Sequence, residues 1–363
     1  MRLLKLFLIV TNVLYILACQ SETQKESLKI IPVDINQNVP VKLSEIASDI
    51  KMVSLELTDE SIIGYIQKLI FQDELLIVWD NHPGDTKILI FDCNGKYIRR
   101  ISNKGQGPRE FEYINDISFD IKENIIYLAS ARKILSYTKE GKFLNECTNI
   151  NPEYIFFQNG YINFFSTEFG KKTENGFANE TMLYRMDNNC NPVDSLCIKS
   201  VSVTRLIGST GPRKDYVSKI ESQTFIYFPV LTPEPFVRDT LYEIQNNLLV
   251  PFLKLRFSNQ GEVSSRNNRT NHLFRIWRSE RFVFAQYDNN SRGRNIFMHD
   301  LKTGRSANMK DGFIDDIHNT GIVDIHPLYD NYFYYRFIPE ISEETNNEEP
   351  NPNVYIGTFI SDE

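Results

Sequence analysis

The chain has 363 residues, a formal net charge of −7 and 41% hydrophobic residues, enough to bury the core of one large domain or two ordinary ones. The acidic balance excludes a general nucleic-acid binder, because such a protein needs basic surface to displace counterions from the phosphates. Aromatic residues make up 12% of the chain, and this composition favours half-buried pleated sheet.

The first segment has the pattern of a bacterial export signal. Two cations precede a mostly apolar run over residues 6–17, which is too short for a bilayer span of roughly 20 residues and suits a signal-peptide core. The run ends in ILAC over residues 16–19, which looks like a lipobox. We therefore expect a lipoprotein signal peptide over residues 1–18 and a lipidated Cys19, whose two or three acyl chains would anchor the protein to the membrane. The alternative is a plain secretory signal with a chance cysteine.

The segment after the signal is typical of a linker. Residues 20–29 (QSETQKESLK) are polar and lack aromatic side chains, a composition that cannot bury a core. We expect a flexible tether over residues 19–38 and the folded domain over residues 39–363. The predicted location is exported and lipid-anchored in the cell envelope, at the outer membrane.

Four further cysteines stand at positions 93, 147, 190 and 197. Export permits disulfides, but no spacing dictates a pairing. Cys190 and Cys197 flank an NPVD turn and are the one plausible local pair, whereas the alternative is that all four are free thiols. The absence of CxxC gives no support to a thiolate zinc site.

An internal repeat indicates the fold. Residues 87–98 (KILIFDCNGKYI) match residues 133–144 (KILSYTKEGKFL) at an offset of 46 residues, and each copy is a strand, a glycine turn and a second strand. Two shorter strands precede each copy, at 69–78 and 117–128. Four short strands in about 45 residues are typical of a β-propeller blade.

Weaker copies of this unit continue to the C-terminus, near residues 182–187, 239–244, 295–300 and 332–359. Their count predicts an all-β, six-bladed β-propeller with four-stranded antiparallel blades. The acidic stretch 340–353 lies between two strand signals, so we expect a solvated loop inside the last blade.

The stretch KGQGPREF at residues 104–111 contains two closely spaced glycines. It does not fit a dinucleotide fingerprint, because Glu110 stands at the third glycine position and the continuation is strand-like. It lacks the GK[ST] of a Walker A loop as well. We therefore interpret it as a crossover between blades, in which glycine permits unusual φ angles and proline directs the chain. The residues of this structural motif are Gly105, Gly107, Pro108, Glu110 and Phe111.

The same motif resembles the G-x-G-P-G-E-F motif of the six-bladed β-propeller lipoproteins of Bacteroidetes. Residues 239–244 (DTLYEI) and 41–46 (VKLSEI) are also similar to that family, so the resemblance extends over roughly residues 30–363. It implies an NHL-like propeller at the cell envelope and no secure catalytic residues. Arg109 stands where the family has glycine, which restricts φ in this loop.

Carboxylates at strand ends are the first candidate site. Asp80, Asp116 and Asp120 lie at strand ends of the first two blades, near the expected mouth of the central channel. They are interpreted either as turn-capping groups or as a ring around a bound cation, which no EF-hand loop supports.

A repeated Asp-x-His pattern is the second candidate site. In a strand, the Asp and His of each pair share one face, and a hairpin could join both pairs as ligands of a divalent cation, the one cofactor that the sequence suggests. The alternative is that the strands do not pair in register, since a turn signal (NTG) follows the first pair. The predicted ligands are Asp316, His318, Asp324 and His326.

Arginines interleaved with aromatic residues form the third candidate site, within residues 266–294. Arginine suits bidentate contacts with carboxylate or sulfate, and aromatic rings supply stacking, so an acidic sugar or an anionic peptide could dock here. The alternative is a set of strands with their charged faces in water. The predicted ligand-binding residues are Arg275, Trp277, Arg278 and Arg281.

Hydrolase motifs such as G-x-S-x-G and HExxH are absent, so no catalytic residue is assigned. We expect a cell-envelope lipoprotein whose propeller is a binding module for a protein or glycan partner, without catalysis. The alternative is a metal-dependent propeller enzyme, a lyase or hydrolase acting on glycans or lactones, which the Asp-x-His pairs motivate.

Overall fold

Short strands make up nearly all of the regular structure. The computed structural model describes residues 28–72, 74–174, 176–203, 216–229, 238–258, 272–288, 294–339 and 350–361. Within these ranges the only helix is one 3-10 turn, η1 (Leu43–Glu45), and no helix there is long and apolar enough to cross a membrane. The predicted signal peptide and Cys19 lie outside the described residues, as do residues 340–349 of the acidic stretch.

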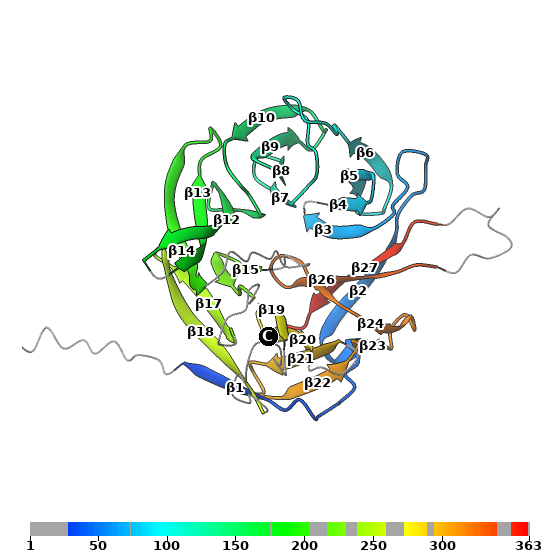
Figure 1. Ribbon diagram of the computed structural model, residues 1–363. Helices are drawn as coiled ribbons and strands as arrows, with labels where there is room; N and C mark the ends of the chain where they lie inside the picture. The colour runs from blue at the N-terminus through cyan, green and yellow to red at the C-terminus, as the bar shows by residue number, and fades with distance from the viewer. Residues whose placement is uncertain are drawn as a thin grey trace, which may run out of the picture.

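Six sheets follow one another around a ring (Figure 1). Each contains four antiparallel strands, which follow one another along the chain in the first five sheets, and this arrangement confirms the predicted six-bladed propeller. In chain order the first five blades are β3 (Ile66–Gln72), β4 (Leu75–His82), β5 (Asp85–Asp92) and β6 (Tyr97–Ile101); β7 (Asp116–Asp120), β8 (Ile125–Ser130), β9 (Lys133–Thr138) and β10 (Phe143–Thr148); β11 (Tyr154–Gln158), β12 (Tyr161–Thr173), β13 (Gly176–Met186) and β14 (Pro192–Val203); β15 (Val217–Ile220), β16 (Gln223–Ile226), β17 (Thr240–Gln245) and β18 (Leu248–Phe257); β19 (His272–Arg278), β20 (Phe282–Asp288), β21 (Asn295–Asp300) and β22 (Ser306–Lys310).

The sixth blade closes the ring with strands from both ends of the domain. It contains β25 (His326–Pro327), β26 (Tyr332–Phe337), β27 (Asn353–Phe359) and, as its outermost strand, β2 (Ala47–Ser54). β2 pairs antiparallel with β27, from Ala47 opposite Phe359 to Ser54 opposite Asn353, and the two lie side by side in Figure 1. A small hairpin of β23 (Phe313–Asp315) and β24 (Gly321–Val323) precedes this blade.

A further strand, β1 (Lys29–Val33), joins the outer edge of the fourth blade and pairs parallel with β18. Ile31 and Val33 are buried in the core between the fourth and fifth blades. The expected tether over residues 19–38 therefore reaches too far, because residues 29–33 belong to a sheet. The polar composition of residues 20–29 concealed this strand, whose apolar side chains alternate only from Ile31 onward.

Each hydrophobic core lies between two neighbouring blades. The cluster between the first and second blades joins Ile77 and Trp79 of β4 to Ile117 and Phe119 of β7. The cluster between the first and sixth blades joins Phe91 to Tyr334. A single blade therefore has no core of its own and depends on its neighbours for burial.

The glycine motif connects β6 to β7 and so passes from the first blade to the second. Its glycines do not have positive φ angles; a Cβ on Gly105 would lie 1.9 Å from Glu110 Oε2. The Glu110 side chain folds back and accepts a hydrogen bond of 2.9 Å from the Gly107 N–H, while Phe111 is fully buried between the two blades. Glycine here leaves room for the close approach of a carboxylate and does not serve to adopt a positive φ.

Arg109 is the residue of this loop with a left-handed backbone, at a φ of 64°. It stands at the position where the resembled motif has glycine. Its guanidinium lies 5.1 Å from the centre of the Phe143 ring, and its N–H donates to Glu146 Oε2 at 3.0 Å. These contacts with β10 offset part of the cost of the left-handed conformation.

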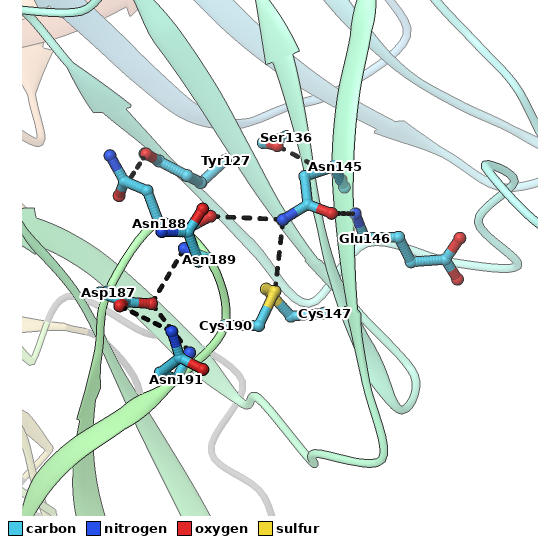
Figure 2. The surroundings of a disulfide bond; sticks show 10 residues. All are labelled: Tyr127, Ser136, Asn145, Glu146, Cys147, Asp187, Asn188, Asn189, Cys190 and Asn191. Atoms are coloured by element: carbon cyan, nitrogen blue, oxygen red, sulfur yellow. Dashed lines mark hydrogen bonds between the residues drawn. A yellow bond between two sulfur atoms is a disulfide. The ribbon is translucent and has the colours of Figure 1, made fainter.

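A disulfide between Cys147 and Cys190 connects the second and third blades (Figure 2). Cys147 lies in β10 and Cys190 in the turn between β13 and β14. The same turn is held by Asn188, whose side chain accepts a hydrogen bond of 3.0 Å from Tyr127 Oη. The local pair Cys190–Cys197 was wrong, because Cys197 lies within β14 as an exposed free thiol while the turn carries Cys190 toward the neighbouring blade.

Removal of the disulfide is expected to destabilise the propeller. The bond closes a loop with a sequence separation of 43 residues, so Cys147→Ala should lower the free energy of unfolding by roughly 2–4 kcal/mol, as measured by urea denaturation. The exposed Cys197→Ala provides the control, with an expected change within about 0.5 kcal/mol. Equal stability of the two variants would contradict a stabilising bond between the blades.

Substitutions of Arg109 should separate backbone strain from side-chain contact. Arg109→Ala keeps the left-handed conformation and loses the contact with Phe143, whereas Arg109→Gly loses the contact but relieves the strain. Because a Cβ costs roughly 1 kcal/mol in this conformation, the glycine variant should be more stable than the alanine variant by about that amount in urea denaturation. An alanine variant as stable as the glycine variant would contradict the strain.

Candidate functional site

A small cavity lies among the described inner strands of the ring. The described inner strands leave a cavity of about 30 Å³, bordered by Lys68, Tyr154 and Tyr329, a volume comparable to that of one water molecule. The Lys68 ammonium lies 4.8 Å from the centre of the Tyr154 ring and donates to Asp116 Oδ1 at 2.8 Å. Lys219 lies 3.9 Å from the centre of the Tyr329 ring.

The three strand-end carboxylates are occupied by protein donors. Asp80 accepts the Tyr65 N–H at 2.8 Å and pairs with Lys87 at 3.2 Å. Asp116 accepts the Ile155 N–H at 2.9 Å in addition to Lys68, and Asp120 accepts a turn N–H at 2.9 Å. Their geometry is that of structural caps and braces between blades.

The predicted metal ligands are distributed over separate contacts. Asp316 accepts two hydrogen bonds from Ser44, and Asp324 forms ion pairs with Arg275 and Arg294 at 3.1 and 2.7 Å. His318 lies 3.4 Å from Tyr335 Oη, and the ring of His326 stacks on Tyr334. Among the described residues, no three His, Cys, Asp or Glu side chains form a group that could hold a metal ion.

The predicted metal ligands do not come together because of the turn that follows β23. Asp315 accepts the backbone N–H groups of Ile317 and His318 and the hydroxyl of Tyr335. This turn ends the strand before the first predicted pair, so the two Asp-x-His pairs do not face each other across a hairpin.

The predicted arginine and tryptophan site is largely internal. Trp277 is 3% exposed and stacks on Phe284 with ring centres 4.0 Å apart, and Arg275 is 2% exposed beside Asp324. Arg278 lies against Phe225 and Phe252, and burial lowers the pKa of its guanidinium to about 10. Arg281 makes a bidentate pair with Asp300. These side chains brace the fifth blade, because β19 is its inner strand and is covered on both faces.

Two larger cavities lie in one seam, between the third and fourth blades. The first, which we call the Gln158 cavity, has a volume of about 330 Å³. The second, the Tyr242 cavity, has a volume of about 310 Å³. Neither cavity was predicted from the sequence. The sequence indicates only the turns at Asn159-Gly160 and Asn246-Asn247, whose asparagines line the Gln158 cavity.

A row of cross-strand partners builds one wall of the Gln158 cavity. Phe156 in β11 pairs with Asn163 in β12, Asn163 with Arg185 in β13, and Arg185 with Asp194 in β14. Directly paired residues point to the same face of a sheet, so this row presents an aromatic ring, an amide and an ion pair to the seam.

Polar side chains that line the Gln158 cavity form hydrogen bonds and an ion pair with one another. Arg185 makes a bidentate pair with Asp194, with Nε 2.8 Å from Oδ1, and its guanidinium lies 5.2 Å from the centre of the Tyr161 ring. From the fourth blade, Thr224 donates to Gln158 Oε1. The ion pair carries no net charge, so the lining favours neither anions nor cations.

The Tyr242 cavity is more apolar in its side chains. Ile226, Phe228 and Leu249 border it together with Tyr242. Lys254 and Asp239, which also line it, lie 3.5 Å apart as an ion pair.

Comparison with solved structures found a chain of similar fold at low sequence identity. A protein of Bacteroides fragilis NCTC 9343 that is considered to be exported matches with 16% identity and a TM-score of 0.66, over 92% of this chain and 100% of that one. The β-propeller domain of the trilobed protease from Pyrococcus furiosus matches with 12% identity and a TM-score of 0.40, over 81% and 83%. No curated protein matches. A family model described as a domain of unknown function, DUF4934, matches residues 28–356, and the chain therefore belongs to the DUF4934 family.

Proposed function

We propose that the protein is an exported, lipid-anchored binding module whose propeller holds a glycan or protein ligand in the Gln158 cavity. The observation that carries this proposal is the cavity itself, which is lined by several polar side chains together with the apolar side chains of Phe156, Leu183 and Ile244. Its volume is in the range of small ligand sites, and this combination of groups is typical of them.

The metal-dependent enzyme is the weaker candidate. Its four expected ligands are engaged by Ser44, Arg275, Arg294 and aromatic rings. Among the described residues that line the Gln158 cavity, the one carboxylate, Asp194, is already paired with Arg185. A paired carboxylate is a poor general base, so the side chains there support binding rather than catalysis.

Two observations support export. The Bacteroides fragilis relative is considered to be exported, and disulfides such as Cys147–Cys190 persist in oxidising compartments. The ILAC sequence before residue 20 supports the lipid anchor.

Substitutions in the Gln158 cavity should weaken ligand binding. A glycan array and a panel of envelope proteins would supply the ligand, and calorimetry would measure its affinity. Asn163→Ala and Thr224→Ala should each lower affinity about tenfold, as expected for the loss of one hydrogen bond of about 1.4 kcal/mol. The exposed Asn36→Ala, on a distant loop, should leave affinity unchanged. If both cavity variants bind the ligand with the same affinity as the original protein, the binding site lies elsewhere.

Lipidation can be tested through the location of the protein. The original protein should fractionate with membranes, whereas Cys19→Ala should appear in the soluble exported fraction, because it lacks the acyl chains that hold it in the bilayer. Immunoblots of the two fractions measure this, with the substitution Cys197→Ala in the propeller as control. The same distribution for the original protein and Cys19→Ala would support the plain secretory signal instead.

A further inference from the structure

The two cavities of the seam share the same strand faces. In β17, Thr240, Tyr242 and Ile244 point to one side, since alternate residues of a strand share a face. Thr240 and Tyr242 border the Tyr242 cavity, and Ile244 borders the Gln158 cavity. One face of β17 therefore borders both cavities.

The adjoining strand and the opposite blade repeat this pattern. In β16, Thr224 borders the Gln158 cavity and Ile226 the Tyr242 cavity. In β14, Asp194 borders the first and Ile198 the second, with the partly buried Leu196 between them, although a register shift against β13 at Ile198 interrupts the regular alternation there. Both walls thus run the length of the seam.

We infer that the two cavities are the ends of one cleft that binds a linear, uncharged glycan. This inference rests on the proposed binding function. Ile244 lies four positions after Thr240 in β17, which corresponds to about 13 Å along a strand at 3.3 Å per residue. The apolar side chains of Leu196 and Ile244, packed on the core between the blades, form the floor that an extended ligand crosses.

The chemistry of the walls favours a sugar chain. At the Gln158 end, amides, a hydroxyl and a neutral ion pair can both donate and accept hydrogen bonds, which suits the vicinal hydroxyl groups of a sugar. At the other end, Tyr242, Phe228 and Leu249 suit the C–H faces of sugar rings. The charges of Asp239 and Lys254 are paired, and Arg238 at the same end makes a further interaction within the protein.

A peptide strand fits this cleft less well. Extended peptides are recognised chiefly by main-chain hydrogen bonds to an open sheet edge. β13 and β17 are interior strands of their sheets, hydrogen-bonded on both sides. β14 is the outer strand of the third blade, but it borders the cavities with the side chains of Asp194 and Ile198, because the two blades pack face to face rather than edge to edge. The occupant is therefore bound through side chains, as a glycan is.

Dependence of affinity on chain length tests the inference. The probes are neutral linear oligosaccharides of glucose, xylose and mannose, each from the monosaccharide to chains long enough to cross both cavities, titrated by calorimetry into the full-length protein. For the sugar that binds, affinity should increase about tenfold or more with length and then level off, because each added contact worth about 1.4 kcal/mol gives a factor of ten.

Variants at the two ends should respond differently. Tyr242→Ala should weaken the long chains about tenfold and leave the shortest binding chain unchanged, whereas Asn163→Ala should weaken all of them. Tyr113→Ala, which removes an exposed tyrosine of the second blade's entry loop, is the control, and thermal unfolding checks that each variant is folded. If Tyr242→Ala fails to fold, Leu249→Ala tests the same end.

The results of these titrations distinguish a failure of the continuous cleft from a failure of the proposed binding function. Affinity that does not depend on chain length, together with an effect of Asn163→Ala and none of Tyr242→Ala, would overturn the continuous cleft and leave the binding function in place. Binding of an extended peptide or protein segment, with no sugar bound, would overturn the glycan class. A ligand insensitive to all of these variants would remove the seam as the site and with it the proposed function.

Discussion

Burial between adjacent blades is the constraint on which the whole structure depends. A four-stranded blade has two apolar faces and cannot cover either alone, so each face needs a neighbour and the sixth blade must meet the first. The ring closes through β2 and β27, which bring residues from both ends of the domain into one sheet. Loss of that pairing would expose the faces of the first and sixth blades to water.

The same constraint explains why residues that the sequence suggested as ligand-binding residues have structural roles. Trp277 and Arg275 occupy an inner strand, where both faces are covered, so stacking and ion pairing there stabilise the fifth blade. Glu110 and the glycines around it brace a crossover. Residues whose type suggests catalysis or ligand binding in the sequence are often needed in such a fold to provide hydrogen bonds to buried polar groups between the blades.

The seam between the third and fourth blades departs from this close packing. Its core of aromatic side chains, including Tyr154, Phe165 and Phe228, leaves a cavity at each end. On the side of the third blade, the Cys147–Cys190 bond fixes the turn that connects β13 to β14, the two strands that supply Arg185 and Asp194 (Figure 2). The disulfide therefore supports the wall of the candidate site as well as the ring.

The sequence by itself determined the blade unit and its number. The repeats found at residues 87–98 and 133–144 are the third strand, the turn and the fourth strand of two blades, because strand alternation and glycine turns are local signals that a chain carries wherever it folds. Only the tertiary structure decided the partner of Cys190, the role of β1 and the location of the cavities. Each of these depends on which faces of different blades meet, and on how well they fit, which no local pattern records.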